Sequence, residues 1–200
     1  MSAPIDFYFD FSSPYGYFAS TRIDSIAAKH GRDVNWHPIL LGAVFKVTGG
    51  APLPSLPLKG DYAKFDIPRC ARLLGLPFRF PTKFPIATQA AARMTVWAQS
   101  LNRARAKTLA SALYRAYFAD DRDITSPEVC ADLAAACDFD RARALASIND
   151  PAVKDKLKTE MDVALARDVF GSPYIVVDGE PFWGADRLDH VDHWLATGGW

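Results

Sequence analysis

Cysteine is scarce in this chain of 200 residues, and the three cysteines present do not pair in sequence. Cys70, Cys130 and Cys137 are odd in number, and no two of them form a C-x-x-C motif. This set argues against a disulfide framework and nearly excludes a disulfide oxidoreductase, which needs neighbouring thiols. The cysteines therefore favour a reducing compartment, and we expect a cytoplasmic protein.

An excess of one charge sign is also missing. Lys plus Arg and Asp plus Glu balance at 23 each, so no net charge draws the protein toward nucleic acid or an anionic membrane. No run of about eighteen apolar residues predicts a membrane helix, and the start of the chain lacks the features of a secretory signal. His190 and His193 are three residues apart without an evident third ligand, so we expect no metal site.

The N-terminal part predicts a strand, a helix and a second strand. Residues 4–11 are rich in Ile, Phe and Tyr and are typical of a strand, as are residues 33–39. Ser13-Pro14 predicts a helix start that continues to about residue 28, because serine caps helices and proline suits the first helical position. Residues 49–60 are rich in Gly and Pro and are expected to be irregular.

A long helical block and a hairpin follow. A helix with a break or kink at Pro68 is predicted over 61–74, then an extended segment, and then helices over 88–101, 103–119, 126–137, 140–148 and 151–168. Strands are predicted at 174–177 and 181–183 around Asp178-Gly179, which is typical of a type I′ turn, and Asp186 is expected to begin the last helix.

The order of these elements predicts an α/β fold with a thioredoxin-like βαβ…ββα core and a large all-helical insertion. The expected divisions are a thioredoxin-like N-terminal half over 1–60, a helical insertion over 61–168 and a thioredoxin-like C-terminal half over 169–200.

Motifs along nearly the whole chain resemble the 2-hydroxychromene-2-carboxylate isomerases. They are FYFDFSSPYGYF, WHPILLGAVF, KGDYAKFDIPR, GLPFRFP and FGSPYIVVDGEPFWGADRLD. That family belongs to the DsbA-like thioredoxin superfamily, beside the kappa-class glutathione transferases. The resemblance implies a glutathione-dependent homodimer that interconverts 2-hydroxychromene-2-carboxylate and trans-o-hydroxybenzylidenepyruvate during aromatic degradation.

The resemblance also assigns site residues. It places the catalytic serine at Ser13 and the cis-proline at Pro173. The residues it implies for glutathione binding are Ser13, Ser172, Pro173, Gly184, Ala185, Asp186 and Arg187. The chain departs from the pattern at Ala185, where relatives carry Ser or Asn. It departs again at Leu53-Pro54, where the naphthalene-pathway isomerase has a polar and basic stretch that helps hold the substrate carboxylate.

The residue types at the first helix start indicate the chemistry. Ser13-Pro14-Tyr15-Gly16 stands in place of C-x-x-C, and a serine hydroxyl is a poor nucleophile without a base. Its economical role is to donate a hydrogen bond to a thiolate that a ligand brings. A helix terminus contributes roughly 0.3–1 kcal/mol, up to ~2 when partly buried, and a hydrogen bond to a charged group roughly 1.5–3 kcal/mol. At about 1.36 kcal/mol per pKa unit, together they lower a thiol pKa by roughly one to three units.

Alternatives remain open at several positions. Ser13 is an N-cap without chemistry in the simplest alternative, and Ser12 is a rival for the catalytic role. Asp186 is predicted to cap the last helix, to bind the amino end of glutathione, or both. Other side chains that could contact an aromatic carboxylate substrate are Phe84, Lys46, Trp183, Phe11, Tyr15 and Lys59, although aromatic residues at such spacing are more often core.

Three functions are compatible with the sequence. The first is a glutathione-dependent isomerase of an aromatic unsaturated oxo-acid that works through a thiolate adduct. The second is a kappa-like glutathione transferase, which shares the thiolate step but consumes the electrophile. The third is a redox-inactive thioredoxin-like module that binds a peptide or partner beside Pro173.

Overall fold

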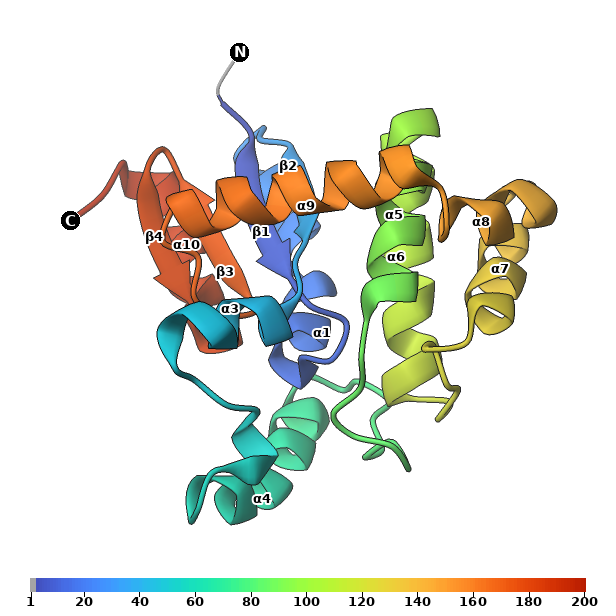
Figure 1. Cartoon of the computed structure of the whole chain (residues 1–200). Coiled ribbons are helices and arrows are strands. Elements are labelled where there is room, and N and C mark those ends of the chain that lie inside the picture. Colours follow the sequence, from blue (N-terminus) through green and yellow to red (C-terminus); the bar gives the residue numbers. More distant parts are fainter. Residues whose placement is uncertain (1–2) are drawn as a thin grey trace.

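The computed structural model describes residues 3–200 and contains one mixed four-stranded sheet (Figure 1). The strand order is β2-β1-β3-β4, with β1 parallel to β2 and antiparallel to β3, and β3 antiparallel to β4. The strands are β1 (Ile5–Phe9), β2 (Val34–Pro38), β3 (Tyr174–Val177) and β4 (Glu180–Trp183). The two ends of the chain therefore meet in one sheet, as the predicted βαβ and ββα halves require.

The helix predicted after Ser13 is two helices, α1 (Pro14–Ser20) and α2 (Ile23–Lys29). The break has a local cause. The Thr21 hydroxyl donates to the Phe18 carbonyl at 2.8 Å, and the Thr21 N–H turns to the same oxygen. Such side-chain hydrogen bonds to nearby carbonyls compete with helical ones, so the chain changes direction before α2.

The segment between β2 and the helical block holds a helix that the sequence did not predict. This helix, α3 (Leu41–Thr48), buries only Val44 and ends at Gly49, whose φ of 72° is in the left-handed region. A short 3₁₀ helix, η1 (Leu53–Ser55), interrupts the irregular stretch, and α4 (Lys59–Leu73) follows. Pro68 lies inside α4 without ending it.

The helical insertion is confirmed, with each helix within two residues of its predicted ends. Its members are α5 (Gln89–Leu101), α6 (Arg103–Phe118), α7 (Pro127–Ala136), α8 (Arg141–Ser147) and α9 (Pro151–Ala166). In Figure 1, α5 to α8 stand beside the sheet and α9 runs back across it. The divisions near residues 60 and 168 stay a prediction.

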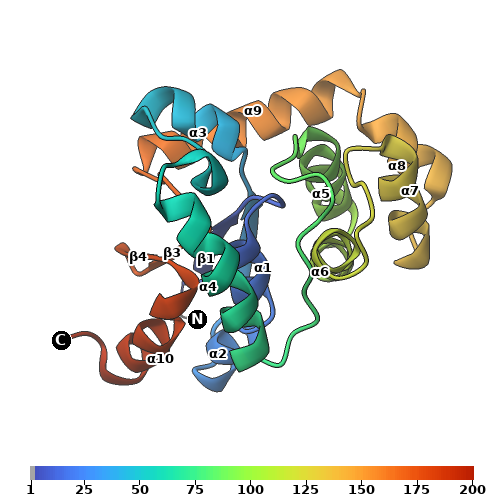
Figure 2. The ribbon, with the colours of Figure 1, turned by 90° about the horizontal axis from the view of Figure 1, so that it is seen from below.

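Side chains alternate across the sheet and build a core on each face. Phe7 and Phe9 pack toward the larger core, which α1, α2 and α6 complete. Tyr8 faces the opposite way and packs with Met161 of α9 and Val44 of α3. Seen from below, α4 lies next to α1 and α10 lies next to α2 (Figure 2). The C-terminal end of β1 thus points into the space between α1, α3 and α4.

The C-terminal hairpin is confirmed, and the start of the last helix is corrected. Asp178 and Gly179 have φ values of 52° and 93°, as a type I′ turn requires. Ala185–Arg187 form a second 3₁₀ helix, η2, before α10 (Leu188–Thr197). Asp186 therefore does not cap α10: Arg187 holds that position, without a side-chain hydrogen bond. Within residues 3–200, no helix is long and apolar enough to span a bilayer.

Candidate active site

A cavity of about 1040 Å³ opens at the C-terminal end of β1. It is lined by α1, α3, η1, α4 and the loops that carry Pro85 and Pro173. The predicted site residues that the fold brings to this cavity are Ser13, Phe84, Ser172, Pro173, Trp183, Gly184, Ala185, Asp186 and Arg187. Segments more than 150 residues apart in sequence thus meet in one hollow, as the 159 residues between Ser13 and Ser172 illustrate.

Two predicted substrate contacts lie elsewhere. Lys46 is exposed in the last turn of α3 and does not line the cavity. Phe11 is fully buried and packs edge-on against Phe9, so of the two alternatives for this residue it takes the core position. Lys59, at the start of α4, does line the cavity.

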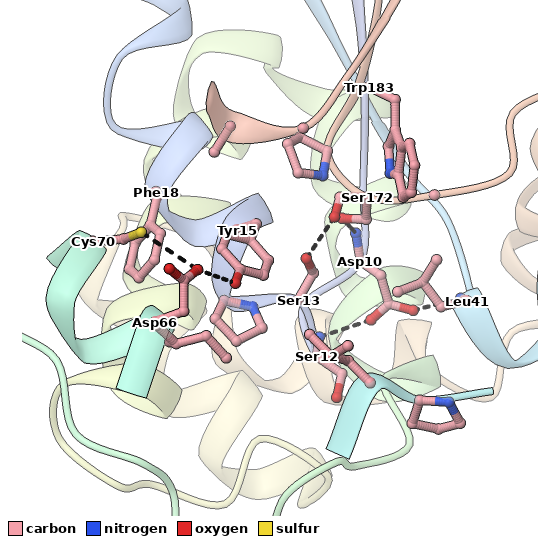
Figure 3. A pocket seen from close by; sticks show the side chains of 18 of the residues that line it. Asp10, Ser12, Ser13, Tyr15, Phe18, Leu41, Asp66, Cys70, Ser172 and Trp183 are labelled. Carbon is pink, nitrogen blue, oxygen red and sulfur yellow. Dashed lines mark hydrogen bonds between the residues drawn. The ribbon is translucent and has the colours of Figure 1, made fainter. Parts of the chain in front are cut away.

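Ser13 caps α1 and reaches across to the proline loop (Figure 3). Its Oγ accepts from the Gly16 N–H at 3.0 Å and donates to the Ser172 carbonyl at 2.7 Å. The side chain is buried, at 5% exposure. Its one donated hydrogen bond thus goes to a backbone oxygen, and a thiolate placed here must compete for that proton.

Ser12, the rival candidate, has a different surrounding. Its Oγ accepts from the Ile86 N–H at 3.1 Å and so ties the turn before α1 to the segment after Pro85. The Phe84–Pro85 peptide bond is cis, which the sequence did not predict. Ser12 therefore joins two backbone segments, whereas Ser13 sits at the helix end itself.

Gly16 occupies the place of the second cysteine in a C-x-x-C motif, and its space is filled by neighbouring hydroxyls. A Cβ at this position would lie 2.5 Å from the Tyr114 hydroxyl and 2.8 Å from Ser172 Oγ. Tyr114 is itself buried and donates to the Asp10 carbonyl at 2.9 Å. The packing thus leaves no room for a second redox residue.

The proline loop and the hairpin end form the opposite wall. The Ser172–Pro173 bond is cis, as predicted, and the Pro173 carbonyl accepts from the Gly184 N–H at 3.1 Å. Asp186 and Arg187 lie at the rim of the cavity, where Asp186 Oδ2 is 3.6 Å from Arg187 Nη2. Their side chains are 72% and 46% exposed. A carboxylate and a guanidinium are thus open to a ligand there.

A polar cluster on α4 faces Tyr15 and was missed by the sequence reasoning. The Tyr15 hydroxyl donates to Asp66 Oδ2 at 2.7 Å (Figure 3), and Arg69 donates to Asp66 Oδ1 at 2.6 Å. Burial raises the pKa of Asp66, but the hydrogen bonds from Tyr15, Arg69 and Tyr62 outweigh it and hold the pKa below its usual value. Burial, and then Asp66, raise the pKa of Tyr15.

Cys70 lines the same wall of the cavity and is half-buried. Its Sγ lies 3.7 Å from Asp66 Oδ2. Burial raises the pKa of this thiol, and the nearby carboxylate raises it further. The i, i+4 spacing of Asp66 and Cys70 on a predicted helix was the available signal for this cluster.

Asp10 has no predicted role in the sequence analysis. Its carboxylate lies in the cavity floor and is 3% exposed. No group of three or more potential metal-ligating side chains occurs within residues 3–200. The site therefore consists of hydroxyls, one buried carboxylate, a charged rim and an apolar wall.

These features define a thioredoxin-fold protein whose first helix begins with serine where redox members carry cysteine. The DsbA-like thioredoxin domain model matches residues 4–196. The 2-hydroxychromene-2-carboxylate isomerase of Sphingobium xenophagum is 30% identical over 206 residues, covering 98% of this chain and 99% of the relative. Glutathione S-transferase kappa 1 of Homo sapiens is 25% identical over 203 residues, covering 96% and 90%.

A solved structure of a 2-hydroxychromene-2-carboxylate isomerase superposes with a TM-score of 0.86 at 26% identity, covering 96% of this chain and 94% of that one. The chain belongs to the DsbA-like thioredoxin family and, within it, to the 2-hydroxychromene-2-carboxylate isomerases. The named relatives are isomerases and kappa-class glutathione transferases, so the sequence and fold together support a glutathione-related isomerase or transferase.

Proposed function

We propose that the protein is a glutathione-dependent isomerase of 2-hydroxychromene-2-carboxylate or a similar aromatic unsaturated oxo-acid. The observation that carries this proposal is the Ser13 hydroxyl, which lies at a helix N-terminus inside a cavity of about 1040 Å³. A cavity of that size suits two small molecules held side by side. The names of the relatives support the same reaction class.

The donor set of the cavity fits glutathione. One wall offers Asp186 for an ammonium group and Arg187 for a carboxylate, and both are exposed at the rim. The backbone at Ser172 precedes a cis-proline and can pair with an extended ligand in the manner of an added strand. Lys59 adds a second cation to the lining. Bound glutathione would supply a thiolate that adds reversibly to one carbon of a conjugated C=C double bond. The carbon–carbon bond is then single and can rotate before the thiolate leaves again.

Ser13 is the residue that would stabilise this thiolate. In the structure its hydroxyl donates to the Ser172 carbonyl at 2.7 Å. Rotation of the hydroxyl toward a sulfur atom would free that carbonyl to accept from a ligand N–H. The total number of hydrogen bonds is then conserved, so little free energy opposes the exchange.

The apolar wall would hold the aromatic part of the electrophile. Phe84 and Trp183 line the cavity, and Trp183 is 58% exposed. We assign the substrate carboxylate to Lys59, because Lys46 does not reach the cavity. Cytoplasmic location and a homodimer, both expected from the sequence, complete the proposal; sedimentation velocity of the purified chain tests the dimer.

Ser13→Ala tests the proposal. The substitution removes a hydrogen bond to a charged group worth roughly 1.5–3 kcal/mol, so turnover should fall about 10- to 150-fold. Loss of the cap should cost about 0.5–2 kcal/mol of stability. Ser12→Ala is the matched control, and it should retain most of the turnover because Ser12 bonds to Ile86. Unchanged turnover in Ser13→Ala would remove this serine from the mechanism.

The fate of the thiol separates the competing functions. An isomerase leaves the total thiol concentration constant while product absorbance changes. Stoichiometric loss of thiol identifies a kappa-like transferase, which the kappa-class relatives favour as the second candidate. Absence of glutathione binding by calorimetry at millimolar ligand identifies a redox-inactive binding module.

A further inference from the structure

Asp10 directly follows β1, and its side chain points into the floor of the cavity (Figure 3). Burial raises the pKa of this carboxyl, while hydrogen bonds from Ser12, Leu41 and Thr88 lower it. All three of these partners are neutral. Burying a carboxylate without a cation costs free energy unless hydrogen-bond donors satisfy it. The donors around Asp10 therefore show which segments its carboxylate holds together.

The three donors belong to three different segments of the chain, and those of Ser12 and Leu41 line the cavity. The Ser12 N–H donates to Oδ1 at 2.7 Å and fixes the turn before α1. The Thr88 hydroxyl, at the start of α5, donates to the same oxygen at 3.0 Å. The Leu41 N–H, at the start of α3, donates to Oδ2 at 2.6 Å. One side chain thus holds together the beginnings of three helices.

The backbone of Asp10 extends the same connection. Its carbonyl accepts from the Ser13 N–H and from the Tyr114 hydroxyl, each at 2.9 Å. Its N–H donates to Ser172 Oγ at 2.9 Å. Ser13, which we assign to the sulfur of the ligand, and Ser172, which we assign to its backbone, therefore both bond to Asp10.

We propose that Asp10 is a positioning residue for the reaction at Ser13. Its carboxylate fixes the turn that presents the Ser13 hydroxyl and sets the start of α3, whose Leu41 and Phe45 form part of the apolar wall. This inference rests on the proposed function. Misplacing a reacting group by about 1 Å can cost on the order of 100-fold in rate, so a loosened Asp10 should act on turnover more than on ligand binding.

Two substitutions test the hydrogen bonds around the Asp10 carboxylate, and one should weaken them more than the other. Asp10→Asn keeps the size of the side chain but replaces one acceptor oxygen with an NH₂ group, which must face a donor. Thr88→Val removes one donor and keeps the carboxylate. Asp6→Asn is the matched control: Asp6 lies on β1, outside the cavity, where it bonds to His37 and Arg167.

The experiment measures kcat and KM for trans-o-hydroxybenzylidenepyruvate at saturating glutathione, below the unfolding temperature of every variant. Glutathione Kd is measured by calorimetry. We expect kcat of Asp10→Asn to fall at least about tenfold and that of Thr88→Val about two- to fivefold, with glutathione Kd within about threefold of wild type. Asp6→Asn should keep kcat within about twofold even where its unfolding temperature falls.

A second measurement reports the positioning directly. In Asp10→Asn, hydrogen exchange at the Ser12 and Leu41 amides should accelerate, while exchange at Phe7 in the middle of β1 should not. An Asp10→Asn kcat within about twofold of wild type overturns the role of Asp10, as does an equal loss in Asp6→Asn. A wild-type protein that neither binds glutathione nor turns over overturns the proposed function instead, so the two failures are distinguishable.

Discussion

Gly16 offers a sharp test of the packing at the helix start, because alanine should be harmful there although it favours helices. Alanine in a helix interior is normally more stable than glycine by about 1 kcal/mol. At Gly16 the added Cβ would lie 2.5 Å from the Tyr114 hydroxyl and 2.8 Å from Ser172 Oγ. Neither hydroxyl can move away freely. Tyr114 is fully buried and bonded to the Asp10 carbonyl, and Ser172 Oγ accepts from the Asp10 N–H.

The net magnitude follows from three contributions. Overpacking of a well-filled core costs roughly 1–3 kcal/mol. Displacing the Tyr114 hydroxyl weakens a hydrogen bond worth about 1 kcal/mol. The gain in helix propensity offsets about 1 kcal/mol. Gly16→Ala should therefore destabilise the protein by about 1–3 kcal/mol, which lowers the unfolding temperature by roughly 2–12 °C in a domain of this size.

Urea and thermal denaturation followed by circular dichroism measure this effect. Gly42→Ala is the matched control, because Gly42 also lies in a helix and its added Cβ would meet nothing within 4 Å. The control should be neutral or slightly more stable than wild type. An equal or higher unfolding temperature for Gly16→Ala would refute the conclusion that hydroxyls fill the place of the second cysteine.

Two further predictions concern groups whose pKa is shifted. Hydrogen bonds from Lys83 and Thr125 lower the pKa of Asp123 to about 2 from 3.8. Ionised Asp123 therefore stabilises the folded protein fully above its pKa in the unfolded chain. This stabilisation is lost as the pH falls through its pKa in the folded protein. Urea titrations should show Asp123→Asn less stable than wild type at pH 7 and equal to it near pH 2. Burial raises the pKa of Cys130 to about 12, whereas Cys70 lines the cavity. Iodoacetamide should thus label Cys70 slowly but before Cys130, and bound glutathione should slow the labelling of Cys70. Peptide mass spectrometry measures both rates. Labelling of Cys130 before Cys70 would contradict the burial of Cys130.

The sequence predicted the elements whose signals are local. Ser13-Pro14 predicted a helix start, and the Ser13 side chain accepts the expected backbone N–H. Asp178-Gly179 forms the predicted turn with both φ values positive. Such signals depend on the conformations that a few adjacent residues prefer, so they survive without knowledge of the fold.

Local reasoning failed where tertiary packing decides. The α3 helix buries one residue along eight, too few to give a clear helical pattern. Asp186 was expected to cap α10, but Gly184, at a φ of 116°, directs the chain into a 3₁₀ turn first. Lys46 was proposed as a substrate contact because of its charge, and the direction of α3 leaves it exposed outside the cavity.

The site itself depends on contacts that no short stretch of sequence contains. Asp10 and Thr88 are 78 residues apart, and Ser13 and Ser172 are 159 apart. Each single residue had a simple interpretation, as a strand end, a cap or a loop residue. Their shared role exists only after β1 pairs with β3 and the helical insertion folds back onto the sheet.

The two adjacent serines have different surroundings in the fold, and this difference supports our proposal of Ser13 over Ser12 as the catalytic residue. Ser12 accepts a backbone N–H from the segment after Pro85, and so it serves to join two loops. Ser13 Oγ accepts from the Gly16 N–H of the helix it caps and donates to the carbonyl of Ser172, the residue before the cis-proline. An anion beside Ser13 would therefore feel both the partial positive charge of the α1 terminus and a hydroxyl donor already pointing at the place where a peptide ligand pairs. Ser12 is not at the helix N-terminus and its Oγ accepts from the Ile86 N–H, so this combination is not available to it.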